Sequence, residues 1–432
     1  MQSIWQSSVK MPDFPRLNKD VKTDVLIIGG GIAGILTAYF LKENGIDCVV
    51  CEKERICGNT TQNTTAKITY QHGLIYSKIA KEFSLDTAKL YLQANKAAFD
   101  KYADLCADMD CDYEIKDNYV YSRDNRQALE EELSILKNIY YDAEFCENIP
   151  LPFQTQGAIK FKNQAQFNPL KFLSEIAKKL NIYENTFIRE TGENTAITDK
   201  AKIEAENIIV ATHFPIINKH GFYYLKLYQH RSYMLALENA QNVNGMYVDE
   251  SKTGMTFRNY KDYLILGGGG HRTGKDGGNW KELEAFASIH YPSADIKYMW
   301  AAQDCISLDG MPYIGRYSPK TNNLFVASGF NKWGMTGSML SAMILSDMIA
   351  GKENEYAEIF NPSRSILRPQ LALNGFEAVK NLLTVSKKRC PHLGCALKWN
   401  AAEHSYDCPC HGSRFSQSGK VLNNPANEDL KM

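Results

Sequence analysis

The sequence predicts an α/β fold in which a parallel sheet is joined to a second domain of antiparallel strands. Two observations support this prediction. Short apolar runs of the kind buried on both faces of a parallel sheet recur along the chain, at residues 25–28, 48–51, 208–212 and 324–329. Between about Tyr223 and Tyr298 the pattern changes to short strands bounded by turn residues, at 232–237, 254–258 and 263–266.

These elements divide the chain into a few predicted parts. In the β-rich part, the four glycines 267–270 are expected to form a flexible turn. In the helical insertion, Glu130–Glu132 are expected to lie on a solvated helix face. The parts are a lead-in, 1–23; the α/β domain, 24–222 with 299–352, containing a helical insertion at about 75–150; the β-rich domain, 223–298; a helical linker, 353–384; and a small β segment, 385–432.

The whole-chain totals exclude several classes of partner. The 49 basic and 49 acidic side chains give a formal net charge of zero, so nothing favours binding to nucleic acid. The only apolar stretch resembling a membrane span, residues 25–41, is too short and contains three glycines of a turn motif. Residues 1–10 lack the apolar core of a secretory signal, so a cytoplasmic location is expected. The expected partner is a small-molecule substrate.

A glycine-rich turn follows the first apolar run. Gly29, Gly31 and Gly34 form the pattern G-x-G-x-x-G between a strand and a helical segment. In that setting the glycines allow a tight turn, a close approach to a pyrophosphate and close packing of helix on strand. Glu52 ends the second apolar run, at the distance where an acid binds a ribose hydroxyl. The motif therefore predicts a dinucleotide site, with a purely structural turn as the alternative.

The loop at residues 58–67 is polar and rich in hydroxyl groups, including those of Thr60, Thr61 and Thr65. Such a loop can bind further phosphate or ring groups of a cofactor, and a solvated loop is the alternative. The strand at 208–212 ends in Ala211 and Thr212, whose small side chains leave room for a cofactor beside the first strand.

A second glycine-rich junction between strand and helix lies near residues 324–349. The strand ends at Gly329, and a long apolar helix begins after Gly337. One domain therefore supplies two helix N-termini to one cofactor, and the second can face a ring that becomes negative on reduction.

Four cysteines and three histidines lie within residues 390–411. Cys390 and His392 form C-x-H, and after a gap of fifteen residues Cys408 and His411 form C-x-x-H. Two thiolates and two imidazoles can ligate a [2Fe–2S] cluster, and the same set also suits tetrahedral zinc. The other seven cysteines are scattered along the chain.

Taken together, residues 22–352 resemble the FAD-dependent oxidoreductases of the D-amino-acid oxidase and glycine oxidase type. The resemblance rests on VLIIGGGIAG, Glu52, TTAKITYQHG, IIVATHFP, DGMPYIG and ASGFNKWGMTGSM. It implies a Rossmann-like domain with extended FAD, Glu52 on the adenosine ribose, and Lys67 near the flavin N5 edge. The residues it assigns to the cofactor are Gly29, Gly31, Gly34, Glu52, Thr60, Thr61, Thr65, Ala66, Lys67, Ala211, Thr212, Gly329, Gly334, Met335 and Thr336.

The C-terminal pattern resembles Rieske proteins. This resemblance makes Cys390, His392, Cys408 and His411 the cluster ligands and pairs Cys395 with Cys410 in a disulfide. The strands that normally precede the first ligand loop are absent, so the Rieske segment is expected to be incomplete. Either the flavoprotein part supplies the missing packing, or the cluster is not held.

The predicted function is oxidation of a small amine or amino-acid-like substrate by hydride transfer to FAD, with electrons passed singly through the cluster to an unidentified acceptor. One alternative is an electron-transfer flavoprotein module, and another is an FAD-binding protein whose tail is degenerate or bound to zinc. The candidates for catalysis or substrate contact are Lys67, Lys332, Tyr233 and Arg258, together with His72 and Arg231.

Overall fold

The computed structural model describes residues 2–251 and 254–431. Its first sheet has β1 (Val21–Ile28) at the centre, between parallel strands β2 (Cys48–Cys51) and β10 (Lys202–Val210). The order is β16-β17-β10-β1-β2-β7, where β16 is Tyr313–Arg316, β17 is Leu324–Ser328 and β7 is Ile182–Tyr183; the short strands β8 (Glu190–Thr191) and β9 (Thr195–Ile197) join at β10. The predicted parallel sheet is confirmed for β17, β10, β1, β2 and β7, and the strands β16, β9 and β8 join it in antiparallel pairs.

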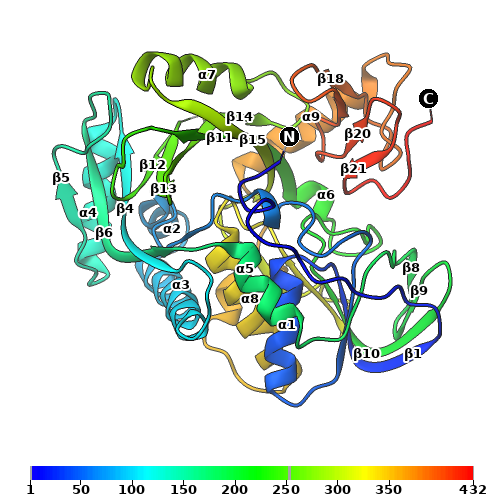
Figure 1. The fold of residues 1–432 in the computed structure, drawn as a ribbon. Coiled ribbons are helices and arrows are strands. Elements are labelled where there is room, and N and C mark those ends of the chain that lie inside the picture. Colours follow the sequence, from blue (N-terminus) through cyan, green and yellow to red (C-terminus); the bar gives the residue numbers. More distant parts are fainter. Residues whose placement is uncertain (1, 252–253, 432) are drawn as a thin grey trace.

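Two helices begin directly after strands of this sheet and pack against each other (Figure 1). Helix α1 (Ile32–Glu43) follows β1, and α8 (Gly334–Ile349) follows β17. Both are buried along most of their length because their sequences are apolar on every side.

The second sheet takes in more of the chain than the predicted residues 223–298. Strands from the predicted helical insertion join it because they pair with strands of the later part of the chain. Every neighbouring pair is antiparallel except β12 with β4, so the sheet is mixed. The order is β15 (Asp295–Ser307), β11 (Leu227–Glu238), β14 (Tyr263–Arg272), β13 (Thr256–Tyr260), β12 (Met246–Asp249), β4 (Glu114–Ser122), β6 (Gly157–Gln166) and β3 (Lys67–Ile68), with β5 (Glu144–Cys146) beside β6.

Two local predictions are wrong. Residues 267–270 form no turn, because all four glycines lie within β14. Gly267 pairs with both β11 and β13 and Gly268 pairs with β11, and the register with β11 shifts before His271. Glu130 and Glu131 are exposed as predicted, but Glu132 is buried, and its carboxylate accepts hydrogen bonds from the backbone N–H groups of Tyr76 and Ser77 at 2.9 and 2.6 Å. It therefore caps the N-terminus of α2 (Ile75–Glu82) from the neighbouring helix α4 (Arg126–Asn138).

The remaining helices cover the outer faces. Helix α5 begins with Pro169 in its first turn, and the Asn168 side chain accepts hydrogen bonds from two backbone N–H groups. No helix within the described residues is both long and apolar enough to cross a membrane. The bounds are α3 (Leu85–Cys106), α5 (Pro169–Ala177), α6 (Tyr223–Lys226), α7 (Asn279–His290), α9 (Pro369–Leu383), and the 3₁₀ turns Thr61–Asn63 and Ala357–Phe360.

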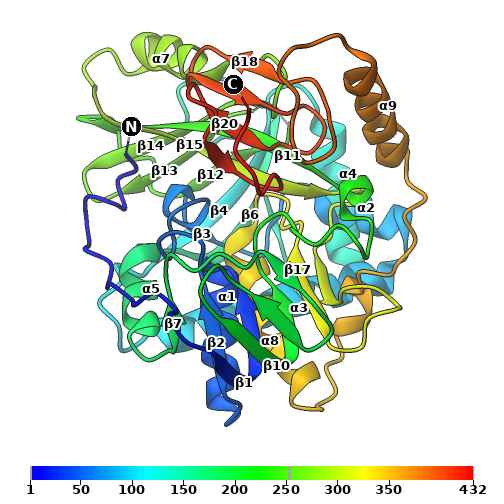
Figure 2. The ribbon, with the colours of Figure 1, turned by 90° about the vertical axis from the view of Figure 1, so that its right-hand side faces the viewer.

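The C-terminal segment is a four-stranded antiparallel meander that lies against the second sheet (Figure 2). Its strands are β18 (Lys398–Asn400), β19 (Ser405–Asp407), β20 (Arg414–Ser416) and β21 (Val421–Asn423). Gln229 of β11 donates to the backbone carbonyl of His411 at 2.8 Å, and Gln303 of β15 donates to that of Gly412 at 2.9 Å. The flavoprotein part therefore packs against the short Rieske segment, as expected under one of the two alternatives for how this segment is completed.

Candidate functional site

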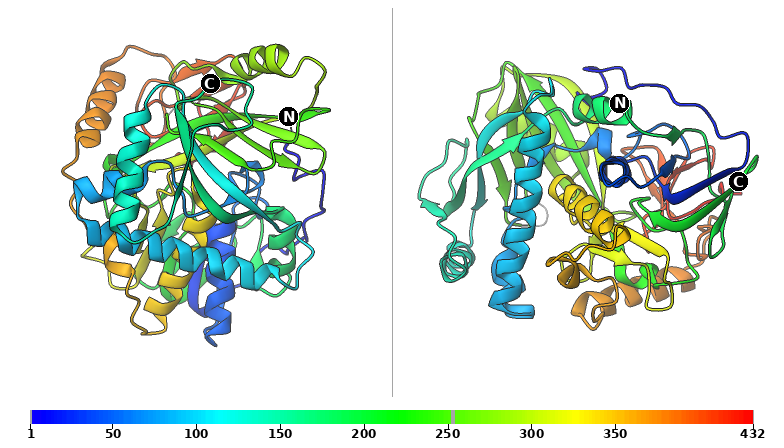
Figure 3. Two further views of the ribbon diagram at one scale, coloured as in Figure 1. Left: turned by 90° about the vertical axis from the view of Figure 1, so that its left-hand side faces the viewer. Right: turned by 90° about the horizontal axis from the view of Figure 1, so that it is seen from below.

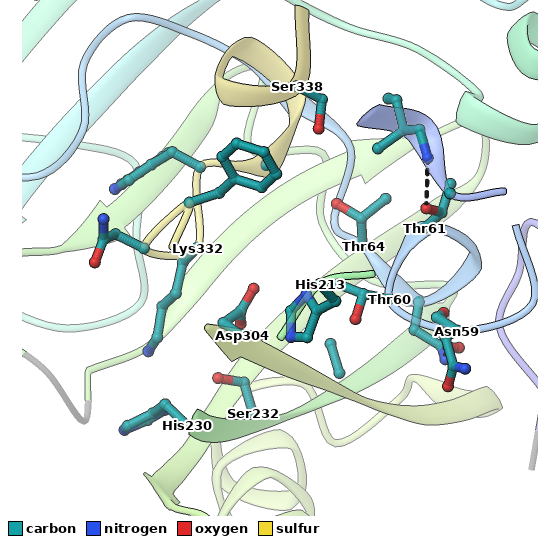
Figure 4. A pocket seen from close by; sticks show the side chains of 18 of the residues that line it. Asn59, Thr60, Thr61, Thr64, His213, His230, Ser232, Asp304, Lys332 and Ser338 are labelled. Carbon is teal, nitrogen blue, oxygen red and sulfur yellow. Dashed lines mark hydrogen bonds between the residues drawn. The ribbon is translucent and has the colours of Figure 1, made fainter. Parts of the chain in front are cut away.

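A cavity of about 590 Å³ is lined by residues of both sheets and of the C-terminal segment. Its walls include the turn before α1, the threonine-rich loop, the start of α8 and the facing strands β11, β14 and β15 (Figure 4). Residues 421–424 of the C-terminal segment form part of the same wall. The cavity therefore connects the predicted cofactor site to both neighbouring domains.

The glycines of the first turn are required by close backbone contacts. Gly29 has φ +111°, and a Cβ atom there would lie 2.5 Å from the carbonyl oxygen of Ala211. A Cβ on Gly34 would lie 2.0 Å from the carbonyl oxygen of Gly29. Gly31 differs, because a Cβ there would have only Thr61 Oγ1 nearby, at 3.4 Å, and the residue opens onto the cavity. This arrangement exposes the N-terminus of α1 to a ligand phosphate.

Glu52 lies at the end of β2 and lines the cavity. Its carboxylate accepts hydrogen bonds from the backbone N–H groups of Gly30 at 2.8 Å and Glu54 at 3.0 Å. Burial raises the pKa of Glu52, and the two backbone donors act in the opposite direction. The two bonds hold the carboxylate beside the turn, where a ribose would lie in an extended dinucleotide.

Two buried polar atoms on the cavity wall have no hydrogen-bond partner among the described residues. They are Ser338 Oγ, in the first turns of α8, and His213 Nε2, just past the end of β10. Burial lowers the pKa of His213 to about 4, so its imidazole is neutral at pH 7. Helix α8 begins without a side-chain cap. Unpaired donors beside an uncapped helix N-terminus fit a polar, anionic ligand such as FAD.

Most residues that the sequence assigns to the cofactor line this cavity, and the others support its walls. Thr336 lies behind the wall, where its hydroxyl donates to the Thr69 carbonyl at 3.1 Å. Those that line the cavity are Gly29, Gly31, Glu52, Thr60, Thr61, Thr65, Lys67, Ala211, Thr212, Gly334 and Met335, whereas Gly34, Ala66, Gly329 and Thr336 do not.

Lys67 and His72 line the part of the cavity next to α8. Lys67 Nζ donates to Thr256 Oγ1 at 2.6 Å, and burial, assisted by the charge of Arg258, lowers its pKa well below the usual value. The His72 ring stacks on Trp333 with centroids 4.9 Å apart. Burial lowers the pKa of His72 to about 3, so this ring is neutral at pH 7 and acts as a fixed polar wall.

Asp304 of β15 and Lys332 of the loop before α8 line the polar end of the cavity (Figure 4). Burial raises the pKa of Asp304 to about 6, and the charges of Lys332 and Arg231 act in the opposite direction. Lys332 is among the residues predicted from the sequence, and Asp304 is not. A single acid within the otherwise uncharged run WAAQDCIS was the available signal.

Alternation along β11 separates two predicted substrate contacts from the cavity. His230, Ser232 and Met234 line the cavity, and the residues between them point to the opposite face. Arg231 therefore forms a buried ion pair with Glu403 of the C-terminal segment, and the Tyr233 hydroxyl donates to Glu403 Oε1 at 3.1 Å. The prediction that Arg231 and Tyr233 contact the substrate is therefore wrong, because their neighbours one position along β11 are the residues that line the cavity.

Arg258, the third misplaced candidate, lies behind the threonine-rich loop. Its Nη1 donates to the backbone carbonyls of Thr65 and Ala66 at 2.7 and 2.8 Å, and its guanidinium lies 5.4 Å from the Trp5 ring centroid. Because Ala66 has φ +54°, these bonds fix an uncommon backbone conformation next to Lys67. Arg258 therefore positions the loop and does not reach the cavity.

The predicted metal ligands lie together in two facing loops. Cys390 and Cys408 are hydrogen-bonded through sulfur, which lowers the pKa of Cys390 to about 7. The rings of His392 and His411 have centroids 5.0 Å apart, and the Nδ1 atoms of both have no partner among the described residues. Burial lowers the pKa values of the two histidines to about 4 and 3. Neutral imidazoles with unpaired nitrogen atoms beside two thiols fit an iron–sulfur cluster.

A disulfide joins Cys395 and Cys410, one from each loop. On the other side, the histidine rings face the flavoprotein part of the chain. Phe214 packs edge-on to both rings, at 6.4 Å from His392 and 6.2 Å from His411. The two loops are therefore tied to each other covalently and face a segment that begins at the cavity wall.

The comparisons with known proteins agree with both parts of the site. The family described as "FAD dependent oxidoreductase" matches residues 24–348, and the "Rieske [2Fe-2S] domain" matches residues 354–432. The second match begins within the predicted linker. A curated Bacillus subtilis (strain 168) protein, "Putative Rieske 2Fe-2S iron-sulfur protein YhfW", is 33% identical over 493 aligned positions, which cover 100% of this chain and 97% of the relative.

Two solved structures share the fold of the larger part. L-proline dehydrogenase from P. horikoshii superposes with a TM-score of 0.67 at 16% identity, covering 80% of this chain and 98% of that chain. Glycine oxidase from Geobacillus kaustophilus gives a TM-score of 0.64 at 16% identity, covering 80% and 100%. The chain therefore belongs to the FAD-dependent oxidoreductase family and carries a C-terminal Rieske domain, so that FAD and a [2Fe–2S] cluster are its cofactors.

Proposed function

We propose that this oxidoreductase removes a hydride from a small amine or amino-acid-like substrate and that the electrons pass on through the Rieske cluster. The observation that carries the substrate class is the pair Asp304 and Lys332, two opposite charges at the polar end of the cavity. FAD, when bound, supplies the hydride acceptor. A cytoplasmic location stays a prediction of the sequence.

In this proposal the two charges orient the substrate. Ionised Asp304 binds the ammonium group, and Lys332 binds the carboxylate at the other end of the same small molecule. The bound ammonium group loses one proton to water before the hydride leaves the adjacent carbon, so the oxidised product is an iminium ion. Glycines of β14 keep this part of the cavity free of side chains. A Cβ on Gly270 would lie 2.8 Å from His230 Cε1, and one on Gly267 would lie 2.6 Å from Thr256 Cγ2. Two proteins of the same fold, L-proline dehydrogenase and glycine oxidase, act on amino acids by name, and this supports an amino-acid-like substrate.

The proposed electron route is short because one segment contacts both sites. Thr212 and His213 line the cavity, and Phe214 packs on the two cluster histidines. Asn424 of the Rieske domain donates to the carbonyls of Thr212 and Phe214 at 2.6 and 2.8 Å. These bonds fix the cluster loops against the cavity wall.

The test is anaerobic mixing of the holoprotein with amino acids and amines, followed by absorption and electron paramagnetic resonance spectra. We expect at least one amine to bleach the flavin absorbance, and the signal of the reduced cluster to grow afterwards. Rapid bleaching by NADH, with none by the amines, would instead identify an electron-transfer module. Bleaching by an amine without any cluster signal would contradict the relay alone.

A further inference from the structure

Helix α9 (Pro369–Leu383) presents its apolar side to solvent. Leu373, Phe376 and Leu383 are 57%, 65% and 78% exposed, and Val379 and Leu382 are also exposed. These five side chains, here called the apolar stripe, recur at three- and four-residue spacing along the helix. The helix stands at the edge of the molecule (Figures 2 and 3). An exposed apolar row of this length marks an interaction site in a soluble domain.

The polar side of the same helix faces the protein. Asn374 is buried and accepts a hydrogen bond from Arg272 Nη1 at 2.9 Å, and Glu377 pairs with Lys275 at 2.6 Å. Asn381 is buried as well. A helix on the surface of a globular protein normally buries its apolar side, so the orientation of α9 is reversed. The polar contacts hold α9 in place, and the apolar stripe remains available.

Basic side chains surround the apolar stripe. Residues 365–393 contain five basic side chains and one acidic side chain, Glu377, which is already paired. Lys380, Lys387 and Arg389 are exposed. Because the whole chain has no net charge, this positive region is local. Exposed apolar side chains flanked by lysine and arginine are the combination that binds anionic lipid headgroups.

We infer that α9 lies on the surface of an anionic lipid bilayer. The helix has 15 residues, so it suits the interface and not a span. A second copy of the chain is a poorer occupant, because a twofold contact would place Lys380 of each copy against a stripe that offers no acidic partner. Leu382 Cδ2 lies 3.9 Å from the position that a Cβ on Gly394 would take, so lipid binding brings the cluster loop to the bilayer.

The test is sedimentation of the holoprotein with phosphatidylcholine vesicles, with and without phosphatidylglycerol. We expect binding that requires phosphatidylglycerol and weakens with salt. The variant Phe376→Ser/Leu383→Ser is expected to bind these vesicles at least on the order of tenfold more weakly than the unmodified protein. The charge variant Lys380→Gln/Lys387→Gln is expected to lose the preference for phosphatidylglycerol.

The control is Tyr140→Ser/Ile289→Ser, which removes two apolar side chains that are 88% and 73% exposed elsewhere on the surface. It should bind like the unmodified protein, and all variants should keep their flavin absorbance and circular dichroism spectrum. Failure of the unmodified protein to bind phosphatidylglycerol vesicles would overturn the proposal. So would a vesicle-free dimer, seen by analytical ultracentrifugation, that the Phe376→Ser/Leu383→Ser variant abolishes.

Discussion

Arg231 of β11 and Glu403 of the Rieske domain form a buried ion pair in which Arg231 Nε donates to Glu403 Oε1 at 2.8 Å. Arg414 approaches the other carboxylate oxygen at 2.9 Å. Burial opposes ionisation of Glu403, but the two guanidinium groups hold its pKa at about 2. The contact joins the Rieske domain to the second sheet through charges shielded from water.

Replacing this acid should loosen the attachment of the Rieske domain. We expect Glu403→Gln to destabilise the domain by about 3 kcal/mol, because it leaves the buried guanidinium of Arg231 without its carboxylate partner, whereas Arg414 keeps Asp407 at 3.0 Å. Thermal unfolding, followed by circular dichroism and by loss of cluster absorbance, measures the change. Glu428→Gln, at an exposed position of the same domain, is the control and should unfold at the same temperature as the unmodified protein.

The same residue should make the domain sensitive to acid. The pKa of Glu403 falls from an ordinary value of 4.5 to about 2 on folding, so its contribution is fully present above about pH 4.5 and is lost as pH falls toward 2. The unfolding midpoint of the unmodified protein should therefore approach that of Glu403→Gln as pH falls from 5 to 3. A constant difference over this range would contradict the assignment.

Asp304 should control the pH dependence of substrate oxidation. Its pKa is raised to about 6, and only the ionised form binds an ammonium group, so kcat/KM should rise with pH through about 6 and then level. Asp304→Asn should remove this limb and lower kcat/KM about 30-fold, or ~2 kcal/mol. Asp262→Asn, at an exposed position, should change neither.

Gly31→Val should give a folded protein without flavin. The apo cavity can accept a side chain there because only Thr61 Oγ1 lies near, whereas the bound pyrophosphate would meet it. The absorbance of the purified variant, compared with its circular dichroism spectrum, measures both effects. Gly375→Ala, in the exposed helix α9 with no atom near the added Cβ, should keep full flavin content.

Cys390→Ser should remove the iron and leave FAD in place, because the two sites use different residues. Metal and acid-labile sulfide analysis of anaerobically purified protein measures the first effect, and flavin absorbance measures the second. Cys305→Ser, at a buried cysteine far from the ligand loops in sequence, should keep both cofactors. Zinc in place of iron and sulfide in the unmodified protein would contradict the cluster assignment.

The parallel sheet and both helix N-termini could be predicted because local sequence determines them. Apolar runs such as 25–28 are buried on both faces, so no choice between faces arises. Along β11 that choice does arise, and a shift of one residue exchanges Arg231 and Tyr233 for Ser232 and Met234. The register depends on pairing with β14 and β15, which the local pattern does not contain.

The other errors have the same origin in long-range contacts. Glycines 267–270 have low strand propensity, yet they lie within β14, where Gly267 pairs with strands on both sides. Strand β4 begins with exposed, charged residues, so its sequence resembles a loop until Tyr119. The capping role of Glu132 could not be predicted locally, because the helix that it caps, α2, is a separate element far away in the sequence.

Residues 421–424 of the Rieske domain form one wall of the flavin cavity, and they follow every other wall in the chain. During synthesis the cavity is therefore open on this side until the Rieske domain has been made and has docked. The domain that holds the cluster ligands therefore supplies the last wall of the cavity to be synthesised.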